Sequence, residues 1–305
     1  MGLSTAGPAR TWRAGDREIP LESPVIAGIL NVTPDSFSDG GRFEQPREAI
    51  ARGRRIAEEG AAILDIGAES TRPGADPVSA DEEWARLEPV LRGLCDLPIP
   101  ISVDTHKLEV AERAVDAGAA AINDVTALRA GPGLARLAAR TGVGLVLMHM
   151  RGTPRTMQLD TAYGDVAAEV RGALADARRA ALDAGCEPGQ IAVDPGLGFG
   201  KSVDGNFELL ARLDEVASLG APVWVGPSRK SFLGALLDVG PAERVTASVA
   251  ASLAAARHGA DVLRVHDVRE VRQALAVERA IDARRAGDVR GARTVIRPRA
   301  AGDAG

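Results

Sequence analysis

The chain has 305 residues, of which 45% are hydrophobic and 26% are charged, proportions typical of a globular protein. Its formal net charge is −5 with no clustered basic face, which argues against nucleic acid as a partner. No apolar run approaches the roughly 18 residues of a membrane span. The first residues also contain no hydrophobic stretch of a secretory signal. We therefore expect a cytoplasmic protein with no membrane partner.

The two cysteines, Cys95 and Cys186, lie far apart, and neither belongs to a Cys-x-x-Cys or Cys/His pattern. Isolated cysteines in a cytoplasmic protein are expected to stay reduced. We predict two mostly buried thiols, and neither a disulfide nor a metal site.

The first element predicted along the chain is a β-hairpin within residues 10–24. Two short extended pieces flank the pair Gly15-Asp16, which favours a tight turn. We expect residues 1–24, an N-terminal extension with this hairpin, to cap the N-terminal end of the domain that follows.

Eight short apolar runs come next, and each closes on a polar or charged residue. The runs begin near residues 25, 62, 99, 119, 144, 190, 223 and 261. Continuous apolar runs, as opposed to alternating ones, are typical of strands buried on both faces of a parallel sheet. The closing residues are Asn31, Glu69, Asp104, Asn123, His149, Asp194, Lys230 and the pair Arg264 and His266.

Amphipathic stretches of helical period separate these runs, and a further one (268–285) follows the last run. Ser79 and Glu82 have the spacing of a capping box at the start of the second helix. A glycine stands where most of the helices should end. The left-handed conformation that often ends a helix favours glycine. These glycines are Gly60, Gly118, Gly142, Gly185, Gly220 and Gly259.

This alternation predicts an α/β protein with a (β/α)8 TIM barrel over residues 25–287 and a mobile tail over 288–305. An open doubly wound sheet is the alternative. Against it, no G-x-G-x-x-G follows the first run, and polar residues close nearly every strand instead of clustering at one switch point.

In a barrel the C-terminal ends of all strands meet on one face, so the closing residues should line one site. Asp104 and Asp194 emerge from buried strands, where a carboxylate is costly unless it is paired or faces a ligand. Together with the amide of Asn123, they suit a flat heterocycle with adjacent N–H donors and a ring acceptor.

A second group of residues predicts an anion site near the same strand ends. Arg72 can present a planar fork to phosphate or carboxylate. Lys230 stands at the start of a helix, where backbone N–H groups attract anions. Arg264 and His266 point the same way from the last strand because strand side chains alternate. A polyanion is the expected ligand.

The polar, glycine-ended loop 31–41 is typical of a segment that closes over a ligand. We expect His149 to support its strand, and His106 and His258 to belong to the scaffold.

With these motifs in place, the chain resembles the dihydropteroate synthases of the folate pathway. The resemblance covers about residues 10–285 and is carried by seven motifs in register. They are NVTPDSFSDGG (31–41), ESTRPG (69–74), SVDT (102–105), INDV (122–125), DPGLGFGK (194–201), SRKS (228–231) and RVHDV (264–268).

The resemblance implies transfer of a 7,8-dihydropterin-6-ylmethyl group from its diphosphate to 4-aminobenzoate, with release of diphosphate. It implies Mg²⁺ as the cofactor, with Asn31 as its protein ligand, and a homodimer as the assembly. The implied pterin contacts are Asp104, Asn123, Asp194 and Lys230. The implied diphosphate contacts are Asn31, Thr71, Arg72, Arg264 and His266. The implied aminobenzoate contacts are Arg72, Ser231, Phe37 and Phe199. The implied catalytic residues are Lys230, Arg264 and His266.

Two other functions fit part of this pattern. One is a pterin-binding barrel that transfers the methyl group of methyltetrahydrofolate, but such an enzyme has no use for the diphosphate-binding motifs. The other is a paralogue that binds pterin without turnover, and it should show gaps among the strand-end residues, where we find none.

Overall fold

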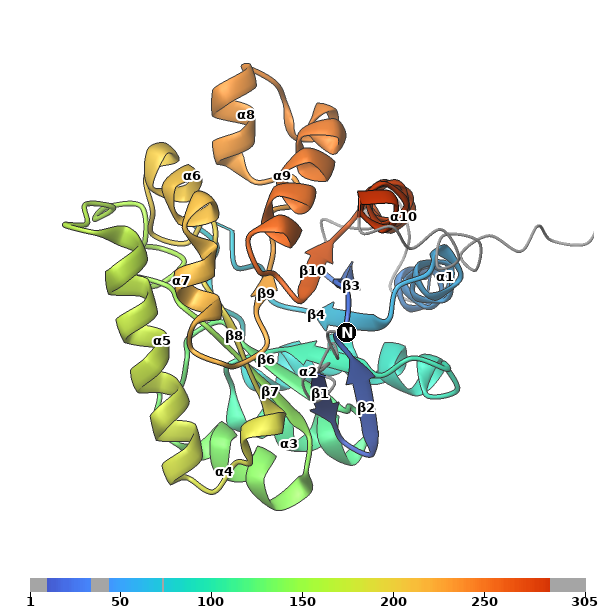
Figure 1. The fold of residues 1–305 in the computed structure, drawn as a ribbon. Coiled ribbons are helices and arrows are strands. Elements are labelled where there is room, and N and C mark those ends of the chain that lie inside the picture. Colours follow the sequence, from blue (N-terminus) through green and yellow to red (C-terminus); the bar gives the residue numbers. More distant parts are fainter. Residues whose placement is uncertain (1–9, 34–43, 73, 286–305) are drawn as a thin grey trace, which may run out of the picture.

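The computed structural model describes residues 10–33, 44–72 and 74–285 (Figure 1). Phe37, most of the predicted closing loop 31–41 and the predicted tail 288–305 lie outside these residues. Among the described residues, no helix combines the length and the apolarity needed to cross a membrane.

A barrel of eight parallel strands forms the centre of the molecule, as predicted. The strands are β3 (Val25–Asn31), β4 (Ile63–Gly67), β5 (Ile101–Asp104), β6 (Ala121–Asp124), β7 (Gly144–Met148), β8 (Ile191–Asp194), β9 (Trp224–Val225) and β10 (Val262–Val265). Their order in the sheet is β8-β7-β6-β5-β4-β3-β10-β9. A parallel bridge between Val193 and Val223 joins the two ends of this sheet. The (β/α)8 barrel is therefore confirmed over the open doubly wound sheet.

Helices surround the barrel and alternate with its strands (Figure 1). Their bounds are α1 (Glu44–Glu59), α2 (Ala80–Leu94), α3 (Leu108–Asp116), α4 (Gly133–Thr141), α5 (Val166–Asp183), α6 (Val203–Ala211), α7 (Leu213–Ala217), α8 (Ser231–Leu237), α9 (Val245–Arg257) and α10 (Val268–Arg285). The sequence predicts one helix where α6 and α7 are separated at Arg212, whose ψ of 28° leaves the helical region. The six predicted cap glycines all have positive φ, between 71° and 103°.

The N-terminal hairpin consists of β1 (Thr11–Ala14) and β2 (Arg17–Pro20) and closes the N-terminal end of the barrel. Trp12 is fully buried there, and its indole packs edge-on against Trp224 with 5.2 Å between ring centroids. Its Nε1 donates a hydrogen bond to the carbonyl of Gln190 at 2.9 Å. The predicted N-terminal hairpin is therefore confirmed.

The prediction of buried thiols is right for Cys186 and wrong for Cys95. Cys186 is buried, and its thiol donates to the carbonyl of Ala135 at 3.1 Å. Cys95 is exposed because it caps the C-terminal end of α2, where the chain turns toward solvent. Both are free cysteines in the structure.

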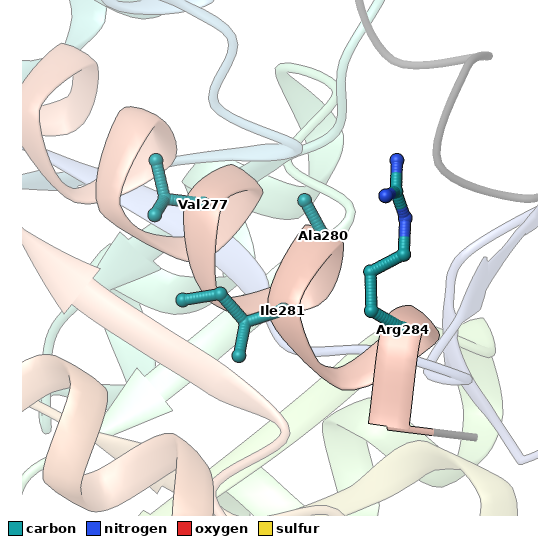
Figure 2. A pocket seen from close by; sticks show the side chains of 4 residues that line it. All are labelled: Val277, Ala280, Ile281 and Arg284. Carbon is teal, nitrogen blue, oxygen red and sulfur yellow. The ribbon is translucent and has the colours of Figure 1, made fainter. Parts of the chain in front are cut away.

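Helix α10 carries apolar side chains on its outer face (Figure 2). Val277 and Ile281 are 61% and 55% exposed, and with Ala280 and Arg284 they line a surface pocket. Large exposed apolar side chains one turn apart on a helix are typical of a contact surface.

Candidate active site

One pocket at the C-terminal ends of the strands contains six of the predicted site residues. They come from five units of the barrel, and all are contributed by strand ends or by the loops that follow. The pocket is lined by Asp104, Asn123, Val125, Met148, Asp194, Gly196, Leu197, Phe199, Gly226, Lys230 and Arg264. The predicted convergence of distant strand ends is therefore correct for these residues.

Arg264 of β10 lies between two carboxylates that point into the barrel. Its Nε donates to Asp65 Oδ2 at 2.6 Å, and its Nη2 donates to Asp104 Oδ2 at 2.7 Å. Asp65 is fully buried and also accepts a hydrogen bond from Asn123 Nδ2 at 3.3 Å. Buried charged side chains require hydrogen-bond or ionic partners. Arg264, Asp65, Asp104 and Asn123 are such partners for one another.

Asp65 was not among the site residues predicted from the sequence. It lies in the middle of the apolar run ILDIG, two residues before the end of β4. The sequence did contain a signal for Asp65, because a charged residue inside a buried apolar run needs a buried partner. From the sequence we expected Arg264 to bind an anionic ligand. In the structure it also pairs with two carboxylates of the protein, those of Asp65 and Asp104.

Burial shifts the pKa values of the two predicted carboxylates upward. The pKa of Asp104 rises to about 7 because loss of hydration outweighs the attraction of Arg264, and the negative charge of Asp65 adds to the rise. Burial raises the pKa of Asp194 to about 6, although Gly196 N–H donates to its Oδ1 at 2.7 Å. Both groups can therefore change protonation near neutral pH.

Lys230 enters the pocket from the start of α8. The preceding Arg229 has φ of 57°, an unusual value for a residue other than glycine. Arg229 is held by the hydroxyl of Ser248 at 2.8 Å and by the carboxylate of Asp267. Lys230 Nζ then lies 4.0 Å from the ring centroid of Phe199. Burial and the charge of Arg264 lower the pKa of Lys230 to about 8.

His266 follows β10 and contacts Ser228, a residue of the loop before α8. Its Nδ1 lies 3.0 Å from Ser228 Oγ, which also accepts a hydrogen bond from the His266 backbone N–H at 3.2 Å. Burial and the nearby charge of Arg264 lower the pKa of His266 to about 3. The imidazole is therefore neutral at physiological pH, and it can donate a hydrogen bond without bringing a positive charge.

The other predicted residues that the structure describes are not among those that line the pocket. Asn31 ends β3, paired in register with Gly67 of β4. Thr71 and Arg72 lie in the loop after β4, where Arg72 is exposed. Ser231 is exposed at the first position of α8.

Glu69, the closing residue of the second run, anchors its loop. Lys107 Nζ donates to Glu69 Oε2 at 2.6 Å and to the fully buried Glu83 at 2.5 Å. The backbone N–H of Val78 donates to the other oxygen of Glu69 at 3.3 Å. The loop that carries Thr71 and Arg72 is thus held at its base.

Comparison with known proteins identifies the relatives of this chain. A family model described as pterin binding enzyme matches residues 27–266. The dihydropteroate synthase of Neisseria meningitidis serogroup B is 46% identical over 272 residues, which cover 87% of this chain and 95% of that protein.

Solved structures give the same result. The dihydropteroate synthase of Xanthomonas albilineans with 4-aminobenzoic acid has 46% identity and a TM-score of 0.85, over 90% of this chain and 99% of that one. The enzyme of Burkholderia cenocepacia complexed with 7,8-dihydropteroate has 43% identity and a TM-score of 0.83, over 92% and 99%.

Proposed function

The chain belongs to the pterin-binding enzymes and, among them, to the dihydropteroate synthases, and on this premise we propose how its residues perform the reaction. The enzyme transfers the 7,8-dihydropterin-6-ylmethyl group from its diphosphate to 4-aminobenzoate, giving 7,8-dihydropteroate and diphosphate. The observation that carries the assignment is the meeting of Asp104, Asn123, Asp194 and Lys230 in one buried pocket.

The pterin ring is proposed to bind in this pocket through its polar edge. Asp194 and Asn123 are 4% and 3% exposed, and no residue that the structure describes donates a hydrogen bond to the Oδ1 atom of Asn123. A buried acceptor without a partner is costly, and an N–H group of the pterin would satisfy it. Asp104 and Asp194 would accept further N–H groups, while Lys230 would donate to a ring acceptor.

The diphosphate is proposed to lie toward the rim, against Asn31, Thr71, Arg72, Arg264 and His266. Asp65 and Asp104 engage two of the five N–H donors of Arg264. The remaining donors of this cation would bind the diphosphate. The neutral His266 would contribute a hydrogen bond to a phosphate oxygen.

4-Aminobenzoate is proposed to bind over the methylene carbon, with its carboxylate at Arg72 and Ser231 and its ring beside Phe199. Phe199 is buried against Lys230 and lines the pterin pocket, so a ring packed on it would lie next to the reacting carbon. Phe37 is the other proposed ring contact and lies outside the described residues.

Mg²⁺ is proposed to accompany the diphosphate. Among the described residues, no group of three or more His, Cys, Asp or Glu side chains could hold a metal ion. Mg²⁺ in phosphoryl sites is commonly bound by substrate oxygens, water and one or two protein oxygens, so the amide oxygen of Asn31 fits such a site. When bound, the ion would neutralise charge on the departing diphosphate.

The chain's own residues are proposed to favour departure of diphosphate before attack by the amine. The pterin ring can delocalise positive charge from its exocyclic methylene, and the carboxylates of Asp104 and Asp194 stabilise that charge. Arg264 and His266 would stabilise the leaving group, and Phe199 would exclude water from the reactive carbon. 4-Aminobenzoate carries its own lone pair, so no strong base is required to activate it.

Release of inorganic diphosphate tests this function. The purified protein is incubated with the dihydropterin diphosphate, 4-aminobenzoate and Mg²⁺, and diphosphate and 7,8-dihydropteroate are quantified together. We expect equal amounts of both products. Binding of the pterin without release would indicate a non-catalytic paralogue, and methyl transfer from methyltetrahydrofolate without diphosphate release would indicate the methyltransferase.

The pH dependence of pterin binding is expected to be bell-shaped, with the tightest binding between about pH 7 and pH 8. Asp104 and Asp194 have raised pKa values of about 7 and about 6, so each becomes protonated as the pH falls through this range and one of its oxygens can no longer accept an N–H group. Lys230 has a lowered pKa of about 8, so its charge is lost as the pH rises further. Calorimetric titration with the pterin substrate at acidic, neutral and alkaline pH measures the effect. An affinity independent of pH would contradict the assignment of these three residues.

The assembly is proposed to be a homodimer in the cytoplasm. The apolar outer face of α10, with Val277 and Ile281, would supply part of the contact (Figure 2). Pairing around a two-fold axis would bury this face against its own copy. Light scattering from the purified protein measures the mass that decides between monomer and dimer.

A further inference from the structure

Lys201 is a buried lysine that the reaction outlined above does not use. It ends the loop after β8, is 3% exposed, and bonds the backbone of two pocket-lining residues. Its Nζ donates to the carbonyl of Gly196 at 2.9 Å and to the carbonyl of Phe199 at 3.0 Å, and lies 3.1 Å from His149 Nδ1. We propose that Lys201 is a positioning residue that fixes the ring of Phe199 against Lys230 and thereby shapes the aminobenzoate site.

The loop that Lys201 holds has a backbone that few sequences can adopt. Gly196, Gly198 and Gly200 all have positive φ, at 68°, 84° and 66°. A Cβ atom at Gly196 would lie 1.9 Å from the carbonyl oxygen of His149, so the loop packs directly on the end of β7. Alternating glycines also lose much conformational freedom on folding. A loop of this kind needs bonds from its surroundings to keep one shape.

Side chains supply such bonds at each glycine of the loop. Gly196 N–H donates to Asp194 Oδ1, and Gly198 N–H donates to Asn206 Oδ1 at 2.6 Å. The Tyr163 hydroxyl donates to the carbonyl of Gly200 at 2.9 Å. Lys201 differs from these side chains because it donates to two backbone carbonyls of the turn, that of Gly196 and that of Phe199.

The surroundings of Lys201 suit a residue that donates hydrogen bonds and does not react. Burial lowers the pKa of His149 to about 3, so its imidazole is neutral and Nδ1 can accept a hydrogen bond from Lys201. The carbonyl dipoles of Gly196 and Phe199 take the other two donors. Burial lowers the pKa of Lys201 itself to about 7, so its amine can donate to both carbonyls in either protonation state, and the ammonium form has a third donor for His149 Nδ1.

The consequence for binding rests on the proposed function, in which Phe199 contacts the aminobenzoate ring. Phe199 sits between Lys201, which holds its backbone, and Lys230, whose Nζ lies 4.0 Å from the ring. Loss of Lys201 would let the turn relax and the ring move. Because misplacement by about 1 Å can change rates by up to ~10²-fold, we expect the KM for 4-aminobenzoate to rise about 10-fold. The dissociation constant of the pterin should change less, because Asp104, Asn123 and Asp194 keep their strand positions.

The test compares Lys201→Met with Gln190→Met. Gln190 is 1% exposed at the opposite end of β8, and its side chain donates to two carbonyls, those of Ala138 at 2.9 Å and Val143 at 2.8 Å. Both variants therefore remove two buried bonds to backbone carbonyls. Both should lower the melting temperature, but only Lys201→Met should raise the KM for 4-aminobenzoate.

A second readout is independent of activity. The protein has five phenylalanines, so fluorinated phenylalanine gives few ¹⁹F resonances, and Phe199→Leu identifies the one from Phe199. That resonance should shift or broaden in Lys201→Met and stay unchanged in Gln190→Met. An unchanged Phe199 resonance and an unchanged KM in Lys201→Met would overturn the inference. Failure of the wild-type protein to form dihydropteroate would overturn the proposed function instead, and the ¹⁹F result would still decide the role of Lys201.

Discussion

Replacing Lys230 with methionine is expected to reduce kcat/KM for dihydropteroate formation by at least about 10²-fold, as loss of one preorganised electrostatic donor does. Methionine keeps most of the side-chain length and its packing on Phe199, so the change removes mainly the charge. Burial and the neighbouring charge of Arg264 lower the pKa of the Lys230 ammonium group to about 8. Interactions there are stronger than in water because solvent does not screen them. The measurement is the rate of diphosphate release over a range of pterin concentrations.

Arg257→Met provides the control for loss of a cation. Arg257 lies in an exposed ion pair with Glu278 on the outside of the barrel, with 66% of its side chain accessible. Surface pairs of this kind contribute little to stability. The control should keep wild-type kinetics. If Lys230→Met also kept them, Lys230 would have no part in binding the pterin or in its reaction.

The barrel could be predicted from the sequence because its signals are local. The apolar run that begins near residue 25 became the strand 25–31, the run that begins near 99 became the strand 101–104, and glycines such as Gly142 ended helices with positive φ. The hairpin around Gly15 followed from its turn residues and two flanking extended pieces. Each of these features depends on neighbouring residues only.

The pocket could be predicted in part, where its residues carry a local signal in the sequence. Asp104, Asn123 and Asp194 were found because they close strands, and all strand ends of a barrel meet. Asp65 and Lys201 were missed because their roles depend on partners far away in the sequence. Asp65 pairs with a residue 199 positions later, and Lys201 bonds His149 from the neighbouring strand end. Spacing in the sequence does not reveal which side chains will face each other across the barrel.

Replacing Arg264 with methionine is expected to lower the free energy of unfolding by about 3–5 kcal/mol, the cost of leaving buried charges without a partner. Arg264 is the cation between Asp65 of β4 and Asp104 of β5, at 2.6 and 2.7 Å. Without it, two carboxylates would share a buried site with no positive charge between them. Catalysis should also fail, because the same guanidinium positions Asp104 in the pterin pocket. The measurement is denaturant unfolding of the variant and the wild type at one pH.

The pH dependence of this loss identifies its cause. The pKa of Asp104 is already raised to about 7 with Arg264 present, and removal of the cation should raise it further. A carboxyl group with a raised pKa favours the folded state less as the pH rises above its unfolded value. The variant should therefore be least stable, relative to wild type, at alkaline pH, and the deficit should shrink as acid protonates the pair.

A second substitution separates charge from packing. Asp65→Asn in the Arg264→Met background removes one of the two carboxylates, keeps the side-chain shape, and leaves Asn123 a partner oxygen. It should recover part of the lost stability if unpaired charge is the cause, since replacing a buried ionic pair with neutral groups is often tolerated. If the double variant were no more stable than Arg264→Met, and its deficit were the same at every pH, the loss would come from packing around the missing guanidinium and the electrostatic account of this site would be wrong.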